Sequence, residues 1–290
     1  MIDYDYMKPE SLDDIFNLLK EYGPRATLIA GGTDVMVKIR NTKKAPDMLI
    51  SLRGLKDLCY IRKNGDYHIG ALATHRMIEQ SDLVQKELTA LYEGASRIGS
   101  VQVRNVATIG GNICNAAPSA DTAGPLLVLD AQVLLKGPDG ERRVPITEFF
   151  VGTYKTVCKE TEVVTEIQIP AEMERFGSAY WKQSRRKAMN LPIVGIAVSL
   201  RLDHETISDC RIALVVAAPT PVRAYKAEAF LMGKSLDDKV LAEAGRIAAS
   251  TECCTLRDSL RGEAWYRAEI IEAYVPRMAR LAAQRINKRN

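Results

Sequence analysis

The sequence contains few of the residues from which metal centres and acid–base sites are commonly built. Its 290 residues include three histidines and six cysteines. No two cysteines are spaced as Cys-x-x-Cys, and their gaps suit neither a zinc site nor an iron–sulfur cluster. The histidines, His68, His75 and His204, are scattered among predicted strands and turns. We therefore expect no metal site in this chain, and we expect the cysteines to be buried, reduced thiols.

Long apolar runs and several well-known motifs are also missing. The longest apolar stretches, such as residues 193–200, are far shorter than the roughly 18 residues of a membrane-spanning helix. The first residues do not show the basic segment followed by an apolar segment that is typical of a signal peptide. G-x-G-x-x-G, the P-loop, G-x-S-x-G and H-E-x-x-H are all absent. A net charge of +4 is too small to indicate nucleic acid. We expect a cytoplasmic protein without nucleic-acid or membrane partners.

The length and the order of the predicted elements indicate two domains. At about 150 residues per domain, the chain is long enough for two. In the second half a block of strands precedes a block of helices, which favours an α+β fold over a doubly wound sheet. A polar, weakly patterned stretch at residues 171–177 separates the halves. We therefore predict domains at 1–175 and 176–290.

Apolar periodicity, capping residues and turn residues locate the individual elements. Strands are predicted at residues 27–30, 47–52, 67–72, 132–136, 143–145, 162–169, 193–202 and 210–218. Helices are predicted after Ser11, from residue 75, and at 86–98, 122–130, 223–231, 237–249 and 261–286.

Two glycine pairs stand in similar settings and are the first candidates for a binding site. They are Ala-Gly-Gly-Thr-Asp at residues 30–34 and Thr-Ile-Gly-Gly-Asn at residues 108–112. Glycine lets backbone N–H groups approach a ligand without an intervening Cβ, and successive N–H groups form an anion-binding nest. Thr33, Thr108 and Asn112 add neutral hydrogen-bond donors, which suit a pyrophosphate. The Asp34 carboxylate has the same sign of charge as a phosphate. We therefore expect it to accept N–H groups of its own loop in an Asx turn. Each pair taken alone is more typical of an ordinary turn than of a binding site.

Two charged residues have both a functional and a structural interpretation. The carboxylate of Asp121 suits hydrogen bonds from sugar hydroxyls, or else it caps the helix that follows. Lys182 lies close to the basic run Arg185-Arg186-Lys187, which alone is typical of a solvated face.

The combination of motifs resembles one flavoprotein family. Thr-Ile-Gly-Gly-Asn at 108–112, followed by Ala-Ala-Pro-Ser-Ala-Asp at 116–121, is similar to the T-I-G-G-N…A-x-P…D signature of the FAD-binding subunits of molybdenum hydroxylases. That family includes the medium subunit of aerobic carbon monoxide dehydrogenase and the middle domain of xanthine dehydrogenase. Residues 30–34 resemble its first FAD loop, and residues 180–186 resemble its F-K-Q-x-S-R-R segment. Residues 261–267 resemble its R-G-x-x-x-Y-R element. The resemblance covers nearly the whole chain.

The resemblance implies a fold and a set of FAD-binding residues. The fold is an FAD-binding domain of the vanillyl-alcohol-oxidase type in two subdomains, followed by a C-terminal domain with a three-stranded antiparallel sheet and a helix bundle. The pyrophosphate lies between the glycine loops, Asp121 binds sugar hydroxyls, and Val164 and Lys182 lie beside the flavin. A cation there favours the reduced flavin, because reduction adds negative charge. The implied cofactor residues are Ile29, Ala30, Gly31, Gly32, Thr33, Asp34, Val35, Thr74, Val103, Ala107, Thr108, Gly111, Asn112, Cys114, Asn115, Asp121, Val164 and Lys182.

The resemblance also implies the partners of the chain. FAD is expected to be non-covalent, because neither His68 nor His75 lies in a matched loop. Substrate oxidation occurs at a molybdopterin centre on a large subunit, and electrons reach this FAD through [2Fe–2S] clusters on a small subunit. They then pass to NAD or another acceptor, so this chain needs no catalytic acid or base. A stand-alone flavin oxidase or dehydrogenase of the same fold and a non-enzymatic partner-binding protein are the alternatives.

Overall fold

The N-terminal part is a small subdomain with its own core. The computed structural model describes residues 3–287, so residues 1, 2 and 288–290 of the two predicted domains lie outside it. Three parallel strands have the order β1-β3-β2. Helix α1 begins where the Ser11 hydroxyl accepts the N–H of Asp14, and it buries Ile15 and Leu19. The elements are β1 (Asp5–Met7), α1 (Leu12–Tyr22), β2 (Ala26–Ile29), α2 (Val35–Thr42) and β3 (Met48–Ser51).

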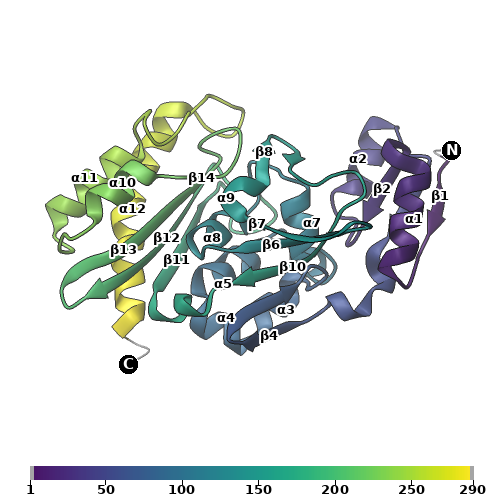
Figure 1. Ribbon diagram of the computed structural model, residues 1–290. Coiled ribbons are helices and arrows are strands. Elements are labelled where there is room, and N and C mark those ends of the chain that lie inside the picture. Colours follow the sequence, from purple (N-terminus) through teal and green to yellow (C-terminus); the bar gives the residue numbers. More distant parts are fainter. Residues whose placement is uncertain (1–2, 288–290) are drawn as a thin grey trace.

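The second subdomain is a five-stranded antiparallel sheet with short helices (Figure 1). Its strands, in sheet order, are β4 (Ile61–Asn64), β5 (Asp66–Gly70), β10 (Val163–Ile169), β6 (Gln132–Gly137) and β7 (Gly140–Pro145). A hairpin of β8 (Phe150–Gly152) and β9 (Lys155–Thr156) forms a separate sheet. The helices are α3 (His75–Gln80), α4 (Asp82–Glu87), α5 (Thr89–Ser96), α6 (Val101–Arg104), α7 (Ile109–Cys114), α8 (Ala123–Val128) and α9 (Ile146–Phe149).

One predicted helix of this subdomain is wrong. Residues 86–98 do not form one helix, because Leu88 has ψ 51° and interrupts the chain between α4 and α5. Leu88 is itself fully buried, so its side chain packs into the core at this break.

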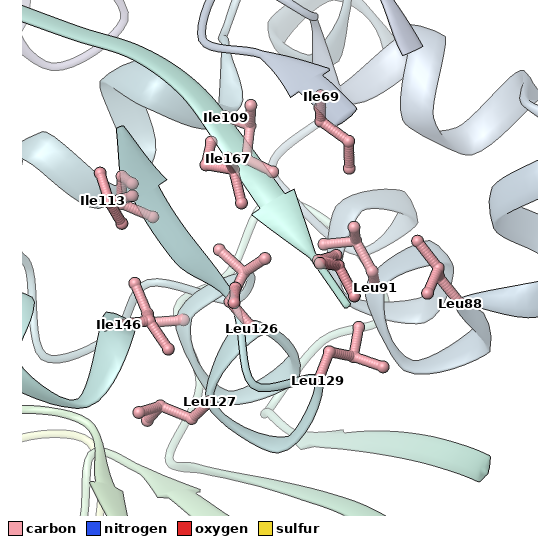
Figure 2. Packing of buried hydrophobic residues seen from close by; sticks show 14 of the residues in the cluster. Ile69, Leu88, Leu91, Ile109, Ile113, Leu126, Leu127, Leu129, Ile146 and Ile167 are labelled. Atoms are coloured by element: carbon pink, nitrogen blue, oxygen red, sulfur yellow. The ribbon is translucent and has the colours of Figure 1, made fainter. Parts of the chain in front are cut away.

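The core of the second subdomain anchors the second glycine loop. Ile109 and Ile113 stand one turn apart on α7 and are fully buried. Figure 2 shows Ile109 beside Ile167 of β10, with Leu126 of α8 below them. Burying a side chain of this size contributes roughly 1.5–3 kcal/mol. The helix that follows Thr108 is therefore held in place from the core side.

The C-terminal domain is an antiparallel sheet covered by helices. Its strands are β11 (Gly177–Gln183), β12 (Val194–Asp203), β13 (Thr206–Val215) and β14 (Val222–Arg223), and its helices are α10 (Tyr225–Leu231), α11 (Asp238–Ala248) and α12 (Ala264–Asn287). The three expected long strands are present, and the two-residue β14 adds a fourth. No helix within residues 3–287 is long and apolar enough to cross a membrane.

The two faces of this sheet belong to two different cores. Successive side chains of a strand point to opposite faces. On one face Ala179, Ile196 and Ile212 pack with the helices, whereas on the other Tyr180 and Ala197 join the core of the second subdomain. The predicted boundary near residue 175 therefore separates elements of the chain, but the packing continues across it.

Candidate functional site

The two glycine loops lie against each other in the folded chain. A Cβ built on Gly31 would lie 2.1 Å from the carbonyl oxygen of Val106, which stands two residues before the second loop. A Cβ on Gly111 would lie 3.9 Å from the Cβ of Ala30. Segments that are far apart in the sequence therefore form one structure.

The two glycines within each pair serve different purposes. The first glycine of each pair is packed, since a Cβ on Gly110 would come within 2.7 Å of the Ala71 carbonyl oxygen, and Gly31 is even more crowded. The second glycine is different. Gly32 has φ +75°, which disfavours other residues. Gly111 is exposed, and the nearest atom to its Cβ would be the Thr108 hydroxyl at 3.0 Å. Gly111 thus leaves backbone uncovered beside the meeting point of the loops, as close approach of a pyrophosphate requires.

Threonine caps fix the second loop and its neighbour. The Thr108 hydroxyl accepts the N–H of Gly111 at 3.1 Å and begins α7. The Thr74 hydroxyl accepts the N–H of Met77 at 3.2 Å and begins α3. Thr74 and Thr108 form an antiparallel bridge, so both predicted residues lie side by side. Ala107 joins them through its carbonyl oxygen, which accepts the N–H of His75 at 3.0 Å.

The first loop is held by an arginine that sequence analysis missed. Arg53 donates from Nε to the Ala30 carbonyl at 3.1 Å and from a terminal nitrogen to the Gly31 carbonyl at 3.4 Å. The expected Asx turn at Asp34 is wrong: Asp34 stands at the start of α2, but its side chain makes no capping hydrogen bond. Desolvation by the surrounding chain raises the pKa of Asp34.

Asp121 and Lys182 form a buried ion pair. The Lys182 ammonium donates to Oδ2 of Asp121 at 2.6 Å and to the Arg97 carbonyl at 3.0 Å. Tyr180 donates its hydroxyl to Oδ1 of Asp121 at 2.9 Å. Both charged side chains are 5% exposed. Burial raises the pKa of Asp121, while the adjacent ammonium and the Tyr180 hydroxyl act in the opposite direction. Burial, together with the charge of Asp121, raises the pKa of Tyr180 far above its usual value.

This ion pair excludes both structural alternatives from sequence analysis. Thr122, not Asp121, occupies the capping position of α8. Lys182 is buried, so it does not belong to the solvated face of Arg185 and its neighbours. Thr122, the residue after Asp121, contacts the second loop, because it donates its hydroxyl to Oδ1 of Asn112 at 2.6 Å. Tyr180 could have been found from the sequence, since residues two apart on a strand share a face.

The remaining predicted cofactor residues lie around these two groups. Ile29 ends β2, Thr33 follows Gly32, and Val35 begins α2. Val103 of α6 packs against Gly99, and Val164 is buried in β10. Cys114 ends α7 and is followed by Asn115.

The expected burial of every cysteine is wrong. All six are free, but Cys59 and Cys114 are exposed and Cys158 is half-buried. Sequence analysis also missed His75 as a notable residue. Its imidazole is fully buried, and neither ring nitrogen has a hydrogen-bond partner in the described structure. Burial and the charge of Arg104 lower the pKa of His75 to about 3, so the ring is neutral.

Comparison with known families accounts for this arrangement. Residues 2–172 match the model of the FAD binding domain in molybdopterin dehydrogenase, and residues 179–282 match the carbon monoxide dehydrogenase flavoprotein C-terminal domain. The chain belongs to this family of molybdenum hydroxylase flavoprotein subunits. It is therefore an oxidoreductase subunit whose cofactor is FAD, and the uncovered backbone at Gly111 fits that cofactor.

Individual relatives resemble the chain over most of its length. The carbon monoxide dehydrogenase medium chain of Hydrogenophaga pseudoflava is 34% identical over 275 residues, which are 94% of this chain and 95% of the relative. The xanthine dehydrogenase FAD-binding subunit of Escherichia coli O157:H7 is 38% identical over 232 residues, 79% of each chain. A solved structure of the Hydrogenophaga pseudoflava carbon monoxide dehydrogenase superposes with a TM-score of 0.92 at 35% identity, covering 97% of this chain and 98% of that chain.

Proposed function

We propose that this chain is the electron-transfer subunit of a molybdenum hydroxylase complex. Electrons released by substrate oxidation at a molybdopterin centre on a large subunit reach it through [2Fe–2S] clusters on a small subunit. They leave to NAD or another acceptor. Bound FAD supplies the chemistry that accepts electrons from the clusters and donates them onward. The names of the relatives support this proposal, since they are a medium chain and an FAD-binding subunit of such dehydrogenases.

The meeting of the two glycine loops is the observation that carries the proposal. The second loop supplies uncovered backbone at Gly111, and we place the FAD pyrophosphate between it and the first loop. The packed glycines, Gly31 and Gly110, bring each loop close to the chain behind it. Arg53 holds two carbonyl groups of the first loop, which leaves that loop ordered for the approach of an anion.

The Asp121–Lys182 pair has hydrogen-bonding capacity left for the rest of the cofactor. Lysine has three donors, and Lys182 uses two of them, on Asp121 and on the Arg97 carbonyl. Its third donor suits the carbonyl edge of the flavin. A carboxylate has about four acceptor sites. Asp121 accepts hydrogen bonds from Tyr180 and Lys182, which leaves capacity for a sugar hydroxyl.

The charges of Asp121 and Lys182 affect the redox potential of the bound flavin. Because Asp121 compensates the ammonium at 2.6 Å, Lys182 favours flavin reduction less than an isolated cation would. A difference of 1.4 kcal/mol corresponds to about 30 mV for a two-electron couple. Asp121 and Lys182 thus act as one unit that orients the cofactor and sets a moderate local potential.

The proposal is tested by flavin content. The chain, co-expressed with a molybdopterin subunit and a [2Fe–2S] subunit of its source, is expected to purify as a complex with a flavin absorption spectrum. Gly111→Val is expected to abolish flavin retention, because its side chain occupies the space beside the loops. Gly111→Ala serves as the matched control with the smaller side chain. Absence of FAD from the wild-type complex, or unchanged flavin stoichiometry in Gly111→Val, contradicts the proposal.

A further inference from the structure

Helix α2 has an unusual surface for a helix of a small subdomain. Of its eight residues, all described, only Ile39 is buried. Met36 is 39% exposed and Val37 is 41% exposed. In most surface helices the apolar side chains face the core and the polar ones face water. Here two large apolar side chains face outward.

The exposed face of α2 is also strongly basic. Lys38 and Arg40 lie on the helix, and Lys43 and Lys44 follow its end, all exposed. No acidic residue occurs between Asp34 and Asp47. Residues three and four apart share a side of a helix, so Arg40 lies beside both apolar residues. Met36, Val37, Lys38, Arg40, Lys43 and Lys44 are together called the α2 surface.

The α2 surface is continuous with the cofactor site. Helix α2 begins directly after the first glycine loop, and the N–H of Met36 donates to the Gly32 carbonyl at 3.0 Å. A Cβ on Gly32 would lie 3.4 Å from the Met36 side chain. Val106, whose carbonyl oxygen faces Gly31, is itself 39% exposed and extends the apolar area. Figure 1 shows α2 at the upper edge of the N-terminal subdomain.

We infer that the α2 surface docks the [2Fe–2S] subunit through an acidic face of that partner. This inference rests on the proposed function. An iron–sulfur cluster held by four thiolates carries net negative charge, which a basic surface attracts. Electron transfer slows steeply with distance, so the partner must bind next to the cofactor, as α2 does. The exposed Met36 and Val37 supply the apolar centre of the contact, and the cations supply its rim.

Other occupants fit this surface less well. A second copy of the chain would place like charges against each other, which costs free energy. A membrane-surface helix buries a broad apolar face, whereas α2 exposes two large apolar side chains. The direct neighbourhood of the cofactor site favours an electron-transfer partner over both.

The test compares charge reversal on α2 with charge reversal elsewhere on the same subdomain. The variants are Lys38→Glu combined with Arg40→Glu, and separately Val37→Glu. The control is Lys20→Glu, which reverses an exposed cation on α1. Affinity for the purified [2Fe–2S] subunit is measured by biolayer interferometry at low and high salt, together with flavin content. We expect both α2 variants to bind the partner at least about tenfold more weakly. The wild type should weaken with salt more steeply than the double variant.

Three results would overturn the inference. The first is an affinity for the [2Fe–2S] subunit in the α2 variants that equals that of Lys20→Glu. The second is loss of flavin from the α2 variants. The third is that the α2 variants lose binding to phosphatidylserine vesicles, measured alongside, while their affinity for the [2Fe–2S] subunit is unchanged. Failure of the proposed function would look different, because the wild type itself would then contain no FAD or capture no [2Fe–2S] subunit. If the docking surface alone is wrong, the wild type contains FAD and captures the [2Fe–2S] subunit, and the α2 variants capture it with equal affinity.

Discussion

The glycine loops and the Asp121–Lys182 pair are two parts of one site that are built by different physics. The loops are built from backbone packed closely against backbone, which requires glycine. A Cβ on Gly31 or Gly110 would collide with the neighbouring backbone. The ion pair uses side chains, both 5% exposed, whose charges are stable only together. Near the loops the buried imidazole of His75 is neutral, whereas the Asp121–Lys182 pair is charged. The loops therefore depend on shape, and the pair depends on mutual compensation.

Breaking the ion pair is expected to have the largest effect. Lys182→Met leaves the Asp121 carboxylate buried without its cation, and the free energy of unfolding should fall by about 3–5 kcal/mol. Urea unfolding followed by circular dichroism measures this change. The double variant Asp121→Asn with Lys182→Met should recover a large part of it, because no lone buried charge remains. A loss below about 1 kcal/mol in the single variant would show that the pair is not stabilised by compensation.

The packed and open glycines of the second loop should respond differently to the same change. In Gly110→Ala the new Cβ would lie 2.7 Å from the Ala71 carbonyl oxygen and 2.8 Å from the Ala71 Cβ. Such overpacking should lower the free energy of unfolding by about 1–3 kcal/mol. In Gly111→Ala the new Cβ would lie 3.0 Å from the Thr108 hydroxyl and 3.9 Å from the Ala30 Cβ, so this matched variant should show a smaller change. Equal thermal unfolding midpoints for the two variants would contradict the division of roles.

His75 should make the loop region sensitive to acid. Its pKa is about 3 in the folded chain, against an ordinary value of 6.5. Between these values the unfolded chain binds a proton that the folded chain does not, so stability falls as the pH falls. This contribution is roughly 1.4 kcal/mol per pH unit. His75→Leu should flatten the decline of the unfolding free energy between pH 6.5 and pH 4. Parallel pH profiles for wild type and variant would refute a buried neutral histidine.

Removal of the cap of α7 should have the smallest effect. Thr108→Ala removes the hydroxyl that accepts the N–H of Gly111 at 3.1 Å, and it should cost about 1 kcal/mol. Thr108→Ser keeps the acceptor and should behave like the wild type in the same thermal unfolding measurement. Because Ile109 and Ile113 also hold α7, the helix should survive in both variants. Equal losses in the alanine and serine variants would show that the methyl group, not the hydroxyl, matters.

Much of the fold could be predicted from the sequence, and its errors have local causes. The cap at Ser11 and the alternation along the C-terminal strands are properties of neighbouring residues, and the structure has them. The helix predicted at 86–98 was wrong because Leu88 leaves helical geometry, and the N–H of Ala90 donates to the distant Ser178 hydroxyl instead of a helical carbonyl. The Asx turn at Asp34 was wrong because the N–H of Met36, which such a turn would use, donates to the Gly32 carbonyl instead.

The two glycine pairs and the helix cap at Ser11 could be predicted from the sequence, because they depend on residues a few positions apart. Three features became visible only in the folded chain: Gly31 lies against Val106, Lys182 compensates Asp121, and α2 presents its apolar side chains outward. The reason is that burial and charge pairing depend on which distant segments meet. The backbone conformation of a turn or a cap, in contrast, is settled within its own few residues.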